Sequence, residues 1–136
     1  MNSKLQNDTP LMHWSQALAS APHVVLRAAI DEPGKIQRLA DGAASLHGLM
    51  QYVRENYPVS GPELADLEWD IDLVEGASAF LYRNLGLSAE DSAARIRRLS
   101  GAMRGTAQFM NHDPMQTWRS VHEAAGAVSN ISADTP

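Results

Sequence analysis

The stretch Ser60–Gly86, SGPELADLEWDIDLVEGASAFLYRNLG, decides the fold class of this chain of 136 residues. Ser60 and Glu63 can form a capping box, Pro62 suits a first helical turn, and Gly86 is a natural stop. Between them, apolar residues recur at spacings of three and four, which places them on one face of an α-helix. The stretch therefore predicts a helix over residues 62–86, whose inner face carries Leu64, Leu67, Ile71, Val74, Ser78, Leu81 and Leu85.

Three other stretches have the same periodicity and their own boundaries. A helix over 35–57 would end at Pro58, Ser88 can cap a helix over 89–111, and Asp113-Pro114 can start a helix over 114–129. The connections between these helices are short, which forces consecutive helices to run antiparallel. We therefore expect an all-α protein, an antiparallel up-down helical bundle of four main helices.

The two ends of the chain are less regular. Residues 9–30 carry a shorter apolar stripe that Pro22 interrupts, which predicts a bent N-terminal helical segment covering the bundle. Residues 1–8 and 130–136 have no periodic apolar positions, and we expect both to be disordered. The expected organisation is a single helical-bundle domain over 9–129.

Composition and charge exclude several classes of function. The net charge of −5 disfavours binding to nucleic acid or to anionic lipid, because both depend on clustered Lys and Arg. The absence of cysteine excludes disulfides and Cys-ligated metals. No apolar run is long enough to cross a membrane, and the N-terminus is too polar for a secretory signal. With a bias toward Ala and Arg that is typical of GC-rich bacterial genomes, the sequence predicts a bacterial cytoplasmic protein without membrane association.

The sequence contains no motif typical of catalysis or of cofactor binding. A nucleophile elbow, a Walker loop and a dinucleotide-binding glycine pattern are all missing. No Glu has a His three residues after it, as a di-metal helical bundle needs, and no two His are four residues apart. We therefore expect no catalytic residue, no metal and no cofactor. An enzyme without a recognisable motif is the third hypothesis.

The helix predicted over 62–86 has a second apolar stripe opposite its inner face. It is either the central helix of the bundle, covered on its far side by the N-terminal segment, or a contact surface for a partner protein or a second copy. In the second case the contact is made by the apolar stripe and an adjacent acidic edge. These six residues are Trp69, Leu73 and Phe80, with Glu68, Asp72 and Glu75.

Arginines cluster in the helix predicted over 89–111. Arg97, Arg98 and Arg104 could form a basic contact surface. A helix-turn-helix is not predicted, because the apolar stripe continues through this region without the breaker that the turn requires.

Small residues occupy the middle of all four predicted helices. Antiparallel pairing places Ala43, Ala77, Gly101 and Ala125 in one layer across the bundle. Because Gly inside a helix lowers the stability of the helix by about 1 kcal/mol relative to Ala, the layer requires an interaction that offsets this loss. It is either a region of close helix packing or a pocket for a small-molecule ligand, and the sequence leaves both open.

These observations favour a small non-catalytic protein that binds another protein, or itself as a homodimer, through a helical surface. Such a protein would be a regulator, an adaptor, an immunity protein or an inhibitor of the phage or plasmid type. The alternative is a ligand-sensing or DNA-associated transcriptional regulator that uses the small-residue layer as its pocket and the three arginines as its contact surface.

Overall fold

The computed structural model describes residues 33–134, and these residues contain helices and no strand. The prediction of an all-α protein is confirmed. The elements are α4 (Pro33–Asn56), α5 (Gly61–Asn84), α6 (Ala89–Thr106), the short 3-10 helix η1 (Ala107–Phe109) and α7 (Pro114–Asp134). The expected disordered segment 1–8 and the bent N-terminal segment lie outside the described residues.

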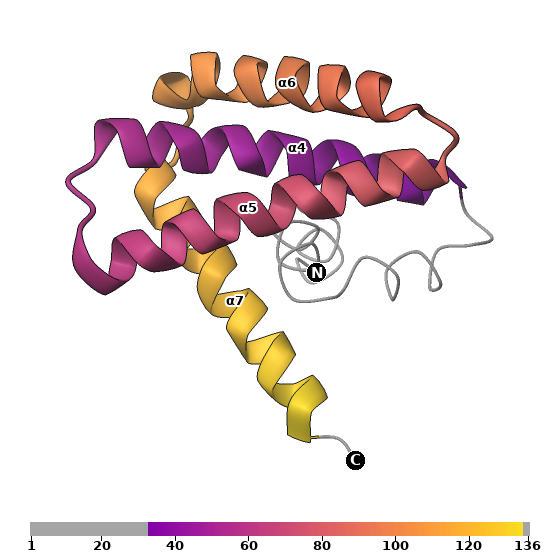
Figure 1. Ribbon diagram of the computed structural model, residues 1–136. Coiled ribbons are helices and arrows are strands. Elements are labelled where there is room, and N and C mark those ends of the chain that lie inside the picture. The colour runs from indigo at the N-terminus through magenta and orange to yellow at the C-terminus, as the bar shows by residue number, and fades with distance from the viewer. Residues whose placement is uncertain (1–32, 135–136) are drawn as a thin grey trace, which may run out of the picture.

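Helix α4 is the central helix (Figure 1), with α5, α6 and α7 packed against it. Among the described residues the central helix is therefore α4 and not the helix predicted over 62–86, whose expected cover, the N-terminal segment, lies outside these residues. The reason is that α4 is buried around most of its circumference, and several of its buried residues are small enough for neighbours to approach closely. The small buried residues of α4 are Ala40, Ala43, Ala44 and Gly48. The larger ones are Ile36, Leu39, Leu46, His47, Leu49, Met50 and Val53.

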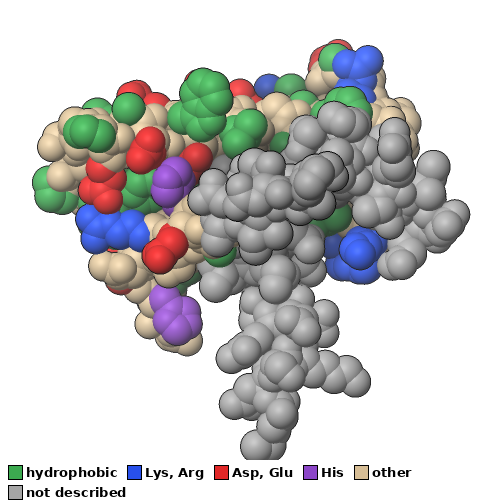
Figure 2. Space-filling view, turned by 90° about the horizontal axis from the view of Figure 1, so that it is seen from below, with side chains coloured by type: hydrophobic (Ala, Val, Ile, Leu, Met, Phe, Trp, Pro, Cys, Tyr) green, Lys and Arg blue, Asp and Glu red, His purple; other side chains and the backbone are tan. Residues whose placement is uncertain are grey.

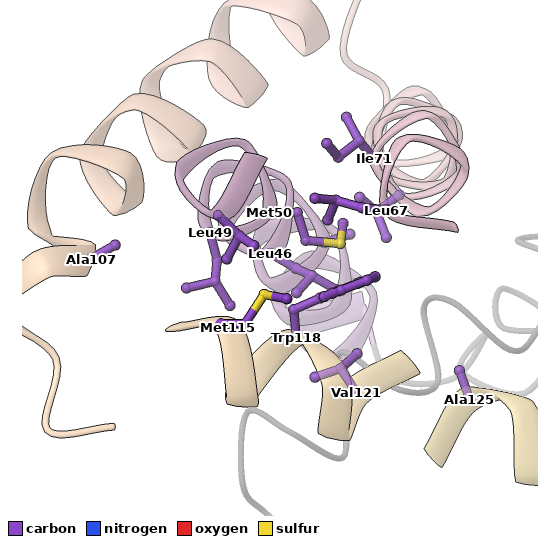
Figure 3. Close-up of a cluster of buried hydrophobic side chains, with 13 residues drawn as sticks. Leu46, Leu49, Met50, Leu67, Ile71, Ala107, Met115, Trp118, Val121 and Ala125 are labelled. Atoms are coloured by element: carbon purple, nitrogen blue, oxygen red, sulfur yellow. The ribbon is translucent and has the colours of Figure 1, made fainter. Parts of the chain in front are cut away.

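The arrangement departs in part from the expected bundle. Helices α4, α5 and α6 run antiparallel in chain order, whereas α7 crosses below α4 and α5 obliquely and points away from them (Figure 1). Trp118 and Val121 of α7 are buried in one cluster with Met50 of α4 and with Leu67 and Ile71 of α5 (Figure 3). The described side chains that hold the fourth helix against the others therefore lie in its first half, from Met115 to Ala125, and the largest is Trp118.

A second apolar cluster joins α4, α5 and α6 toward the start of α4. It contains Tyr82 and Ile96 together with Ile36, Leu39, Ala40, Ala44 and Leu81. Five of the seven residues predicted for the inner face of the 62–86 helix are buried: Leu67, Ile71, Val74, Ser78 and Leu81. The other two, Leu64 and Leu85, lie near the ends of the helix and are half-buried. Burial of such side chains is the main favourable contribution to folding.

The helix boundaries show which local signals were effective. Ser88 caps α6, since its Oγ accepts a hydrogen bond of 3.0 Å from the Asp91 amide, and Gly86 has a positive φ of 97° just beyond α5. Ser60 precedes α5, but its side chain makes no capping hydrogen bond, so the expected capping box is wrong. Helix α7 continues to Asp134, beyond the predicted end at 129, since neither Gly nor Pro occurs between Gly126 and Asp134.

Three of the four residues of the predicted small-residue layer are buried. Ala43, Ala77 and Ala125 are buried, but Gly101 is exposed, and a Cβ built on it would meet no atom within 4 Å. The reason is rotation along α6: Ser100 faces α4, and the next residue lies about 100° further around the helix. The prediction that Gly101 belongs to the layer is therefore wrong.

Two helices approach each other closely at a glycine that the layer did not include. A Cβ built on Gly48 of α4 would lie 2.1 Å from the carbonyl oxygen of Ser100 on α6. Only a residue without a side chain fits this contact, so Gly48 sets the separation of the two helices.

Candidate functional site

The apolar stripe on α5 faces away from the core. Trp69 is 71% exposed, Leu73 37% and Phe80 38%, and their spacings of four and seven place them on one side of the helix. Between them, a Cβ built on Gly76 would meet nothing within 4 Å. The stripe is therefore exposed among the described residues, and the N-terminal segment that was the alternative cover for it lies outside them.

The acidic edge lies beside this stripe on the same helix. Glu68, Asp72 and Glu75 are all exposed, and Figure 2 shows hydrophobic and acidic side chains interspersed on one face of the molecule. Within the described part of the chain, no Lys or Arg forms a salt bridge with any of the three. We call these three carboxylates, with Trp69, Leu73 and Phe80, the docking face.

The arginines predicted to form a basic contact surface differ in their partners. Arg104 Nε is 3.3 Å from Glu55 Oε1. Arg97 and Arg98 are exposed and form no salt bridge with a described residue. The three predicted basic residues therefore do not form one surface of equivalent, unpaired charges.

Asp70 lies beneath the docking face and is buried, with 4% of its surface exposed. Its Oδ2 accepts a hydrogen bond of 3.0 Å from Trp118 Nε1 and is 2.7 Å from His122 Nδ1, at hydrogen-bond distance. The other ring nitrogen of His122 is 3.8 Å from Asp66. The sequence carries one signal of its burial, because Asp70 lies three residues after Leu67, one before Ile71 and four before Val74.

A second buried polar cluster joins α4, α5 and α6. His47 Nδ1 and Ser100 Oγ are 2.9 Å apart, Ser100 Oγ donates a bond of 3.0 Å to Gln51 Oε1, and His47 Nε2 is 3.4 Å from Glu75 Oε2. Burial lowers the pKa of His47, and this effect outweighs the opposing effect of Glu75. A histidine between a serine and a carboxylate also occurs in hydrolases, but Ser100 is only 4% exposed and its proton is directed to Gln51. The cluster connects helices and does not present a nucleophile to a substrate.

A third cluster fixes the opposite end of the three helices. Arg95 of α6 donates two hydrogen bonds of 3.1 Å to Asp41 of α4, and the Tyr82 hydroxyl of α5 donates to the same carboxylate. The Arg95 guanidinium lies 5.6 Å from the centre of the Tyr82 ring. Burial, together with the bond to Asp41, raises the pKa of Tyr82. Arg95 therefore connects α6 to α4 through Asp41.

A hollow of about 440 Å³ lies between α5 and α6, because both helices pack mainly against α4 and contact each other less. Its lining, which defines the α5–α6 hollow, is Glu75, Ala79 and Arg83 from α5 with Ala89, Ser92, Ala93, Ile96 and Arg97 from α6. None of Ala43, Ala77, Gly101 and Ala125 lines it. It does contain two predicted contact residues, Glu75 and Arg97.

The described residues contain no group of three or more His, Asp or Glu arranged to hold a metal ion. None of the helices in residues 33–134 is long and apolar enough to span a membrane. Comparison of the chain with protein-family models, with curated proteins and with solved structures gave no match.

Proposed function

We propose that this protein is a non-catalytic, cytoplasmic protein of bacterial origin that binds another protein through the docking face of α5, as a regulator, adaptor or inhibitor. The observation that supports the proposal is the exposure of Trp69, at 71%, on the same side of the helix as Leu73 and Phe80. Large aromatic side chains dominate the binding energy of protein interfaces, and a contiguous exposed apolar stripe is typical of them.

The acidic edge supports one kind of partner. Glu68, Asp72 and Glu75 lie beside the stripe, so a complementary surface has an apolar pocket for Trp69 with Lys or Arg along one rim. Rim charges of this kind increase the association rate and fix orientation more than they add affinity. The partner proposed here is therefore a protein with a basic rim around an apolar pocket.

The test is a comparison of two exposed aromatic residues. Trp69→Ala removes an exposed aromatic ring from the docking face. Phe109→Ala is the control, because Phe109 is 75% exposed but lies in η1, outside the docking face. Binding partners are captured with the wild-type chain and both variants and compared quantitatively. A partner that depends on Trp69 and not on Phe109 supports the proposal, and equal capture by all three proteins contradicts it.

Once a partner is purified, association kinetics test the acidic edge. Asp72→Lys should slow association and reduce its salt dependence, whereas the dissociation rate should change little. Trp69→Ala should instead accelerate dissociation and weaken binding by about 2 kcal/mol or more. Sedimentation velocity over a range of concentrations shows whether the face binds a second copy. Dimerisation that Trp69→Ala abolishes would replace the heterologous partner by a homodimer.

A further inference from the structure

The α5–α6 hollow has a defined chemical order along its length. Because α5 and α6 run antiparallel from the turn at 86–88, Arg83 and Ala89 lie at one end of the hollow, and Glu75 and Arg97 at the other (Figure 1). Ala79, Ala93 and Ile96 lie between them. From Ala89 to Arg97 the helix rises roughly 12 Å, at about 1.5 Å per residue. The lining of the hollow therefore has an arginine near each end, with Glu75 at the same end as Arg97, and mostly apolar side chains between them.

A buried hydroxyl in the lining lacks a partner. Ser92 is 1% exposed, and its Oγ has no hydrogen-bond partner within the described part of the chain. Buried polar groups nearly always have one, so the Ser92 hydroxyl is a place among the described residues where hydrogen bonding is incomplete, on the helix that lines the hollow. This observation is independent of the hollow's size and charge.

The charges of the lining favour an anion. Arg83 and Arg97 form no salt bridge with a described residue, and the single acidic lining residue, Glu75, has its carboxylate next to His47. Two arginines against one Glu leave the hollow net positive in a chain whose net charge is −5. A guanidinium group binds a carboxylate with two parallel hydrogen bonds, which makes the carboxylate the best match for either end.

We propose that the α5–α6 hollow binds a small amphipathic carboxylate, with its apolar body over Ala79, Ala93 and Ile96 and its head group at Arg97 or Arg83. The apolar middle and the charged ends match the usual composition of small-molecule sites, and a hollow of about 440 Å³ is within their usual size range. The ligand class is that of medium-chain fatty acids and aryl-alkyl acids.

The test uses decanoate as the probe and decanol as its uncharged counterpart, with titration calorimetry and amide chemical shifts as readouts. Decanoate should bind saturably, with shifts centred on the hollow. Arg97→Gln should weaken its binding about tenfold. The matched control is Arg98→Gln, because Arg98 is also exposed but does not line the hollow. Ala93→Leu should fill the hollow and abolish binding, and Ala79→Leu repeats the test if the first variant does not fold.

Several outcomes would overturn the proposal. For the ligands, they are that decanoate at millimolar concentration does not bind saturably, or that decanol binds as well as decanoate. For the variants, they are that Arg98→Gln weakens decanoate binding as much as Arg97→Gln, or that a folded Ala93→Leu or Ala79→Leu variant binds decanoate unchanged. Trp69→Ala should leave decanoate binding unchanged, because Trp69 does not line the hollow. A failure of the proposed carboxylate site can therefore be distinguished from a failure of the proposed docking face.

Discussion

Gly48 of α4 lies directly against the backbone of Ser100 on α6, so that a methyl group added to Gly48 would be 2.1 Å from the Ser100 carbonyl oxygen. The atoms that it would meet belong to the backbone and cannot rotate away. At the same place His47 and Ser100 are joined by a hydrogen bond of 2.9 Å. Close packing and a polar contact thus coincide at the α4–α6 interface.

Gly48→Ala should destabilise the protein by about 1–3 kcal/mol, because α6 must shift away from α4 to accommodate the methyl group. Gly101→Ala is the matched control, since Gly101 is also helical but has open space around it, and it should stabilise the protein by about 0.5–1 kcal/mol. Chemical denaturation followed by circular dichroism measures both. Equal effects of the two substitutions would contradict the close approach.

Asp70→Ala should cost about 1–3 kcal/mol of stability, because it leaves the buried Trp118 indole N–H without its acceptor and removes a partner of His122. Asp72→Ala, two residues further along α5 and exposed, should change stability by less than about 0.5 kcal/mol. The same denaturation experiment compares them. An Asp70 variant as stable as the Asp72 variant would show that the buried carboxylate does not stabilise the contact of α5 with α7.

The protein should lose stability as the pH falls below 6.5, the ordinary pKa of histidine, because the pKa of His47 is lowered in the folded state. The unfolded chain then binds a proton at a pH where folded His47 remains neutral, so protonation favours unfolding. The loss should end once the pH is below the folded-state pKa. Stability is measured between pH 8 and pH 5. His47→Gln should flatten this dependence, whereas His112→Gln, at an exposed histidine, should retain it. Equal slopes in both variants would refute the assignment to His47.

Trp118→Ala should destabilise the protein by about 3–5 kcal/mol, since Trp118 is 1% exposed in the cluster that joins α4, α5 and α7. Trp69→Ala should change stability by less than about 0.5 kcal/mol, because its side chain is mostly exposed. Thermal unfolding of the two variants compares a buried with an exposed tryptophan. A sharp loss of stability for Trp69→Ala would show that Trp69 is a core residue and would contradict the docking face.

Helical periodicity was enough to predict the elements and much of their buried faces. Leu67, Ile71 and Val74 are buried as their spacing predicts, and Ser88 and Gly86 mark boundaries where local chemistry favours them. Such features depend on residues close in sequence, and they are therefore readable without knowledge of the neighbouring helices. The same periodicity grouped Trp69, Leu73 and Phe80 on one side of a helix.

Tertiary structure decided which apolar face remains exposed, which helix is central and which polar residues are buried. The sequence shows that α5 has two apolar sides, but only the placement of α4 and α7 determines that Leu67 is covered and Trp69 is not. Asp70 and Asp72 are alike in sequence, yet one accepts a hydrogen bond from Trp118, which is distant along the chain. Pairings of this kind depend on the packing of side chains from different helices, whereas the pattern of residues along a single helix determines only what each helix can offer.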